Sequence, residues 1–144
     1  MAYFKDGKVR ALYAAVDGLG EGRVSVLRFG SGGTLWAATE GGLSRISNGK
    51  VSTLASKNGL PCDAVHWSME DDDHAVCLYM LCGLVRIARS ELDTWVADPK
   101  HTIQATAFDN TDVVPSVAFL SAFSPRASKS PDGKIWFVSG DGSA

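Results

Sequence analysis

A unit of about 41 residues recurs along this chain, and that period constrains the fold more than any other feature. Residues 42–46 (GLSRI) return as residues 83–87 (GLVRI), 41 positions later. Residues 17–19 (DGL) return as residues 58–60 (NGL), also 41 positions later. A period of this length is typical of architectures in which similar units stack on one another.

One copy of the unit reads as four short strands. Residues 23–29, 34–39, 43–47 and 51–55 are rich in apolar, β-branched or alternating positions, and turn residues separate them. Asn48-Gly49 is the dipeptide best suited to a type I′ turn, because both central residues of that turn take positive φ. Four antiparallel strands in about 41 residues are the unit of a β-propeller blade.

The remaining copies are less complete. Residues 2–15 supply the last strands of a blade, since residues 6–9 (DGKV) match residues 48–51 (NGKV) at a spacing of 42. The next blade is predicted at residues 64–69, 75–80 and 83–88, with an outer strand at 102–108. Residues 132–138 (DGKIWFV) echo residues 32–38 (GGTLWAA), which predicts final strands at 124–129 and 134–139. Residues 109–125 show no clear register.

A helical turn is predicted near residues 90–96. Ser90 is a candidate N-cap, and acidic residues follow it in the first turn, where they favour the helix dipole. The predicted fold class is therefore all-β, a partial β-propeller whose four-stranded blades stack face to face. The expected division is a partial blade (1–19), a blade (20–60), an irregular blade (61–110) and a partial blade (111–144).

Composition argues against several function classes. The chain has 14 basic and 16 acidic residues and no basic cluster, which gives no support to nucleic-acid binding. No segment is apolar over the length needed to span a bilayer, and the N-terminus does not resemble an export signal.

The three cysteines allow at most one disulfide. Cys77 occupies the repeat position of Trp36 and Trp136, so we expect a buried thiol in a strand. No cysteine pair has the close spacing of a structural zinc site, and residues 70–73 (EDDD) lack the glycines and later acid of a calcium loop. We expect no metal and no cofactor.

The combined motifs resemble the two-component regulator propeller repeat. The residues that carry this resemblance are 33–39 (GTLWAAT), Gly42-Leu43, 57–61 (KNGLP) and 130–137 (SPDGKIWF). The resemblance implies the periplasmic or extracytoplasmic sensor region of a bacterial hybrid histidine kinase. It implies a non-catalytic module that binds a small molecule, such as a carbohydrate, or a protein partner. The chain contains no kinase motif.

Propeller geometry also suggests a ligand face, where connectors between blades and inner turns gather. The candidate ligand-binding residues on that face are Asp17, Glu40, Asn58, Asp63, Tyr79, Leu81 and Asp141. No catalytic residue is predicted, and incomplete blades favour association with further blades or self-association.

An alternative is a lyase similar to the streptogramin lyase propellers, with which residues 134–137 (KIWF) are compatible. Such an enzyme needs a histidine and an acid converging on the channel. His66 and His74 fall in a strand and a turn that lead away from it, so the sensor is the preferred hypothesis.

Overall fold

The computed structural model describes residues 1–108 and 127–137 of the chain. The first strands are β1 (Ala2–Lys5), β2 (Lys8–Leu12), β3 (Val24–Phe29), β4 (Leu35–Thr39), β5 (Gly42–Ser47) and β6 (Lys50–Leu54). The later strands are β7 (Val65–Glu70), β8 (Val76–Met80), β9 (Gly83–Ile87), β10 (Ala105–Phe108), β11 (Ala127–Lys129) and β12 (Ile135–Phe137). The helical elements are α1 (Arg89–Ala97) and the 3₁₀ turns η1 (Ala15–Asp17), η2 (Ser31–Gly33) and η3 (Ser56–Asn58).

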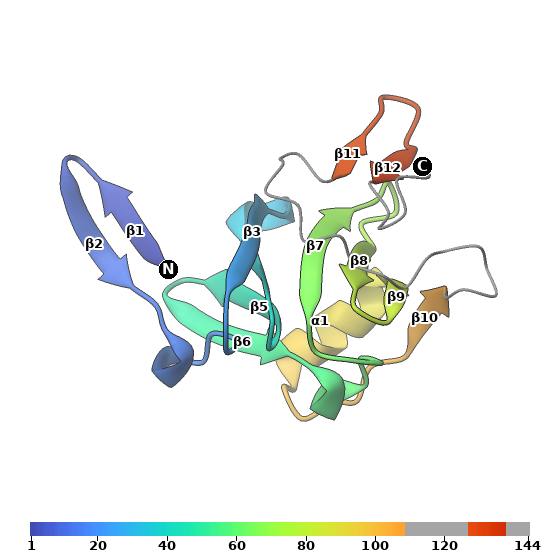
Figure 1. Cartoon of the computed structure of the whole chain (residues 1–144), viewed down its shortest axis with the longest axis horizontal. Coiled ribbons are helices and arrows are strands. Elements are labelled where there is room, and N and C mark those ends of the chain that lie inside the picture. The colour runs from blue at the N-terminus through green and yellow to red at the C-terminus, as the bar shows by residue number, and fades with distance from the viewer. Residues whose placement is uncertain (109–126, 138–144) are drawn as a thin grey trace.

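Two four-stranded antiparallel sheets form the centre of the molecule. Their strand orders are β3-β4-β5-β6 and β10-β9-β8-β7, and the hairpins β1-β2 and β11-β12 form two-stranded sheets at either end (Figure 1). The prediction of an all-β chain with propeller-like blades and one short helix is therefore confirmed. Within the described residues the sheets do not close into a ring.

The two central sheets repeat each other in register. Trp36 lies opposite Arg45 in the first sheet, and Cys77 lies opposite Arg86 in the second, 41 positions later. An irregularity in the first strand also recurs, between Val24 and Val26 and again between Val65 and Trp67. The recurrence shows that the repeat is structural and extends to a bulge that no motif predicted.

Turn chemistry explains the hairpins. Asn48 and Gly49 have φ of 50° and 76°, as the predicted type I′ turn requires, and Asp6 and Gly7 adopt φ of 54° and 76° between β1 and β2. Short polar side chains and glycine tolerate this left-handed region better than other residues.

The second sheet departs from the first after β9. Helix α1 follows β9, and β10 then supplies the fourth strand by pairing with β9, as predicted. Leu92 and Trp95, three residues apart, turn the buried face of α1 into the core. The prediction that Ser90 caps this helix is wrong: Ala88 holds the N-cap, because the chain turns into the helix directly after β9, and Ser90 lies within the first turn.

The main hydrophobic core lies between the two central sheets. Trp36, Ala38 and Leu43 of the first sheet share it with Val65 and Leu78 of the second, and Leu92 and Trp95 of α1 close it on one side. Trp36 is only 8% exposed, as a residue that packs one blade on the next should be. Trp136, at the equivalent position of the last copy, is instead 58% exposed, because no described sheet covers its side of β12.

Two smaller hydrophobic clusters lie on the outer faces of the two central sheets. Trp67, Met69 and Tyr79 of the second sheet pack against Phe137 of the terminal hairpin. Cys77 belongs to this cluster as a free, buried cysteine, as expected. Burial raises the pKa of the Cys77 thiol, which keeps it protonated and unreactive.

Candidate functional site

A groove of about 420 Å³ opens between the 3₁₀ turns η1 and η3. These turns occupy equivalent places in the repeat, one before each central sheet. The groove is lined by Ala15, Gly18, Leu19, Gly20, Glu21, Gly41, Thr53, Ala55, Ser56, Lys57 and Asp63. At this groove the segments that lead into β3 and β7 both meet the β4–β5 turn.

The two turns are built alike. The Ala14 amide donates to the Asp17 carboxylate at 2.9 Å, and the Ala55 amide donates to Asn58 Oδ1 at 3.3 Å. Each turn then ends in a glycine of left-handed conformation, with φ of 101° at Gly18. The recurring Asp or Asn followed by Gly therefore shapes the connector, and its side-chain oxygen is used within the turn.

Asn58 is tied more deeply into the molecule than Asp17. Its Nδ2 donates to the Pro99 carbonyl at 3.0 Å, and its own carbonyl accepts the Ile103 amide at 2.8 Å. Asn58 is consequently buried, whereas Asp17 is exposed.

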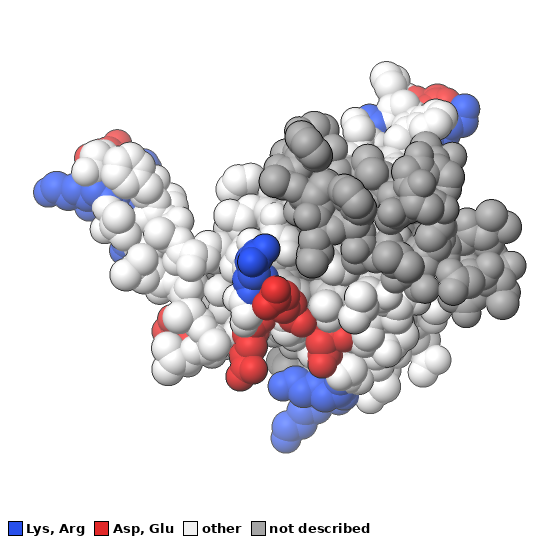
Figure 2. All heavy atoms as spheres, viewed as in Figure 1, with Lys and Arg blue, Asp and Glu red and all other residues white. Residues whose placement is uncertain are grey.

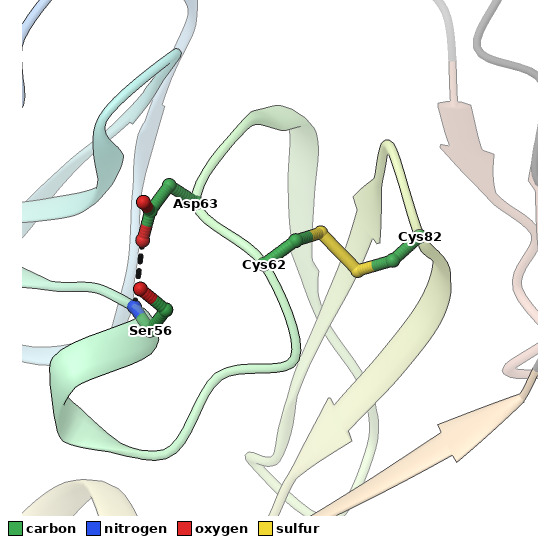
Figure 3. Close-up of a disulfide and its surroundings, with 4 residues drawn as sticks. All are labelled: Ser56, Cys62, Asp63 and Cys82. Carbon is green, nitrogen blue, oxygen red and sulfur yellow. Dashed lines mark hydrogen bonds between the residues drawn. A yellow bond between two sulfur atoms is a disulfide. The ribbon is translucent and has the colours of Figure 1, made fainter.

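Asp63 holds η3 from the other side of the groove. Its Oδ1 accepts the backbone N–H of Ser56 at 2.7 Å (Figure 3). Hydrogen bonds from the backbone and the hydroxyl of Ser56 lower the pKa of this carboxyl, so it is ionised at neutral pH. Asp63 is exposed and contributes negative charge to the groove.

A disulfide anchors the wall that carries Asp63. Cys62 and Cys82 are bonded, with Cα atoms 6.2 Å apart, and link this connector to the β8–β9 turn (Figure 3). The Leu81 amide also donates to the Ala64 carbonyl at 3.2 Å. The segment that lines the groove is therefore fastened covalently and by the backbone to the second sheet.

Hydroxyl groups support the floor of the groove. The Gly20 amide donates to Ser44 Oγ at 2.8 Å, and Thr53 Oγ1 donates to the Gly18 carbonyl at 2.6 Å. Ser44 and Thr53 share a hydrogen bond of 2.7 Å. This chain of bonds joins the first connector to β5 and β6, so the floor is preformed.

The predicted ligand residues are brought together only in part. Asp63 lines the groove, and Asp17 and Asn58 belong to the turns that border it. Glu40 precedes the lining residue Gly41, but its Oε2 accepts the Arg23 amide at 3.0 Å. Leu81 is exposed in the β8–β9 turn, and Asp141 lies outside the described residues.

Tyr79 does not reach the groove. It is 2% exposed, and its ring stacks on Trp67 with centroids 5.9 Å apart and an interplanar angle of 18°. Its place in β8 directs it towards the terminal hairpin. Sequence reasoning missed Glu21 and Lys57, although each lies beside a recurring Asp/Asn-Gly-Leu motif that could have indicated them.

The described lining of the groove offers charged and hydrogen-bonding groups but no histidine paired with an acid. Glu21, Lys57 and Asp63 are its charged lining residues, and none of the histidines lies among the described lining residues. His74 pairs with Glu70, and His101 Nε2 lies 3.2 Å from Glu91. Over residues 1–108 and 127–137, no cluster of His, Cys, Asp or Glu has the arrangement of a metal site.

Charged side chains mark the same region of the surface. Apart from the tips of the terminal hairpins, the red and blue side chains in Figure 2 gather where Figure 1 places the connectors leading into β3 and β7. Acidic and basic groups are both present there. The region therefore suits a polar ligand better than an apolar one.

Comparison with known proteins shows a structural likeness. No family model matches the sequence, and no curated protein matches it. The chain does superpose on the "extracellular domain of the putative hybrid two component system BT3049 from B. thetaiotaomicron", with a TM-score of 0.75 and 20% sequence identity. The likeness shows the fold. It covers 94% of this chain but 17% of that one, so this chain spans a small part of its neighbour's length.

No helix in the described part of the chain has the length and hydrophobicity needed to cross a bilayer.

Proposed function

We propose that this chain is a non-catalytic sensor or scaffold segment from the extracytoplasmic region of a two-component signalling protein. The observation that carries the proposal is the fold likeness to the extracellular domain of a protein of that class. In this proposal the sheets are blades of a β-propeller, and further blades complete the ring.

The Cys62–Cys82 disulfide supports the proposed location. Disulfides persist in oxidising compartments such as the periplasm and are rare in the cytosol. A chain with this bond is therefore better suited to the outer side of the bacterial membrane.

The groove between η1 and η3 is the proposed ligand site. Glu21, Lys57 and Asp63 supply charge, and Gly18, Gly20 and Gly41 leave the lining between them free of side chains. This lining fits a small polar molecule rich in hydrogen-bonding groups, of which sugars are one class. Loops held on a rigid scaffold are common positions for such sites.

Thermal unfolding with a panel of oligosaccharides and charged metabolites tests the proposal. A ligand at about 100 times its dissociation constant adds about 2.7 kcal/mol to stability and raises Tm by roughly 5–10 °C. Glu21→Ala and Lys57→Ala should abolish that shift, whereas Lys50→Ala, at the exposed start of β6, should leave it unchanged.

Two outcomes would contradict the proposal. A shift that is equally large in the Glu21→Ala and Lys57→Ala variants would place the ligand elsewhere. Turnover of a lactone substrate would instead favour a propeller lyase.

A further inference from the structure

The groove between η1 and η3 is a feature of one copy of the repeat. Glu21 and Gly41 meet in its lining, where a Cβ on Gly41 would lie 2.5 Å from the Glu21 backbone nitrogen. Their equivalents 41 positions later are Cys62 and Cys82, which the disulfide joins. The repeat alone therefore does not produce the groove. A crosslink occupies this place in the second copy, whereas a carboxylate beside a bare glycine occupies it in the first.

Two charges of opposite sign line the groove without pairing. Glu21 comes from the segment that leads into β3, and Lys57 comes from η3. Both residues are exposed, and among the described residues neither forms an ion pair. A carboxylate and an ammonium that line one groove without touching each other are both available to a ligand that carries the complementary charges.

Asp63 adds a second carboxylate to the same lining. Its Oδ1 accepts the Ser56 amide, and the disulfide at the preceding residue fastens this wall of the groove (Figure 3). A carboxylate has two oxygens and accepts several hydrogen bonds, so Asp63 keeps acceptor capacity beyond the bond to Ser56. The lining therefore offers two carboxylates to a positive group and one ammonium to a negative group.

The other groups in the lining are small. Gly18, Gly20 and Gly41 carry no side chain, and Ala15 and Ala55 carry only a methyl group. No aromatic side chain is among the described lining residues, so a sugar ring would find no aromatic face to stack on there. Charge is consequently the main basis on which this groove can select a ligand.

We propose that the groove binds a small zwitterion, with its ammonium held by Glu21 and Asp63 and its carboxylate held by Lys57. The inference rests on the proposed function and narrows its class of polar ligands. Free amino acids carry this pair of charges, and short peptides carry the same two groups farther apart. Hydrogen bonds between ionised partners are shorter and stronger than those between neutral groups, which favours such a ligand over a neutral one.

Isothermal titration calorimetry with the standard amino acids and a set of dipeptides tests the proposal. We expect at least one zwitterion to bind. Two analogues of the best amino acid are then compared, the amine that lacks the carboxylate and the carboxylic acid that lacks the amine. Each should bind at least about 10-fold more weakly, because each loses a charge-assisted contact. Binding of dipeptides without binding of amino acids would identify peptides as the source.

Charge-neutralising variants assign each end of the ligand. Glu21→Gln should weaken binding of the zwitterion at least about 10-fold, yet leave the affinity for the carboxylic acid analogue unchanged, since that analogue has no ammonium. Lys57→Gln should weaken the zwitterion equally and leave the amine analogue unchanged. Lys50→Gln, at the exposed start of β6, is the matched control and should alter none of these affinities.

The outcomes separate this inference from the proposed function. If neutral oligosaccharides bind in a manner that Glu21→Ala abolishes, while no amino acid or peptide binds, the zwitterion proposal is wrong and the sensor proposal stands. An amino acid whose affinity is unchanged in both Glu21→Gln and Lys57→Gln would also overturn the zwitterion site. If no small molecule of either class binds, the groove is not a ligand site and both proposals for it fail.

Discussion

Removal of the Cys62–Cys82 disulfide should weaken the folded state by a calculable amount. The bond joins positions 20 residues apart. Loop-closure entropy for a loop of this length corresponds to about 3 kcal/mol, since the crosslink restricts the unfolded chain. For a chain of this size that loss lowers Tm by roughly 10 °C.

Urea unfolding of the Cys62→Ala/Cys82→Ala variant measures this loss directly. Its midpoint should fall and its m-value should rise, because an unfolded chain without the crosslink exposes more surface. Reduced wild-type protein is the matched control, because it loses the bond but no side-chain atoms. Excess reductant keeps Cys77 from pairing with Cys62 or Cys82 once urea has exposed it.

The result also distinguishes two roles for the bond. If it acts only on the unfolded chain, the reduced protein and the double variant will agree within about 1 kcal/mol, near the entropy value. A loss below about 1 kcal/mol in both would refute the reasoning. Faster hydrogen exchange confined to the Ser56 amide would show that the bond also holds Asp63 in position against η3.

Other substitutions test the turns, the groove and the core. Gly59→Ala should lower the free energy of unfolding by about 3 kcal/mol or more, since φ is +104° and a Cβ would lie 2.5 Å from a backbone carbonyl oxygen. Gly49→Ala, with open space around the position, should cost only about 1 kcal/mol in the same urea measurement. Asp63→Ala should cost about 1 kcal/mol at pH 7 after allowance for solvent screening. In the folded state the pKa of Asp63 is lowered below 3.8, so its contribution to the free energy of unfolding is present at neutral pH and is lost as the pH falls through the folded pKa. Unfolding of the wild type and of Asp63→Ala should therefore differ less at about pH 2.5 than at pH 7. Trp36→Ala should cost about 3–5 kcal/mol and Trp136→Ala under about 0.5 kcal/mol in the same urea measurement, because Trp36 is buried and Trp136 is exposed.

Local turn signals made much of the fold predictable. The Asn48-Gly49 dipeptide and its Asp6-Gly7 counterpart fixed two hairpins, and the 41-residue spacing placed the second sheet. These predictions hold because backbone conformation at such positions depends on neighbouring residues alone. The register irregularity before Val26 and Trp67 could not be predicted in this way, since it depends on pairing with the next strand.

The cysteine pairing and the helix start depended on tertiary structure. Three cysteines permit several pairings, and only the approach of one connector to the β8–β9 turn selects Cys62 with Cys82. Serine is a residue type favoured at N-caps, but β9 brings the chain to the start of the helix two residues before Ser90, at Ala88. In both cases packing decided between alternatives that were locally equivalent.

The candidate ligand residues show why a site is harder to predict than a fold. Asp17 and Asn58 lie in the turns that border the groove, yet their side-chain oxygens are used to close those turns. Alternation along β8 places Tyr79 in the hydrophobic cluster beside the terminal hairpin, away from the groove. A residue type that recurs in every copy of the repeat does so because each copy needs it to form its turn or its core. The groups available to a ligand should therefore be sought among neighbours that differ between copies, such as Glu21 and Lys57.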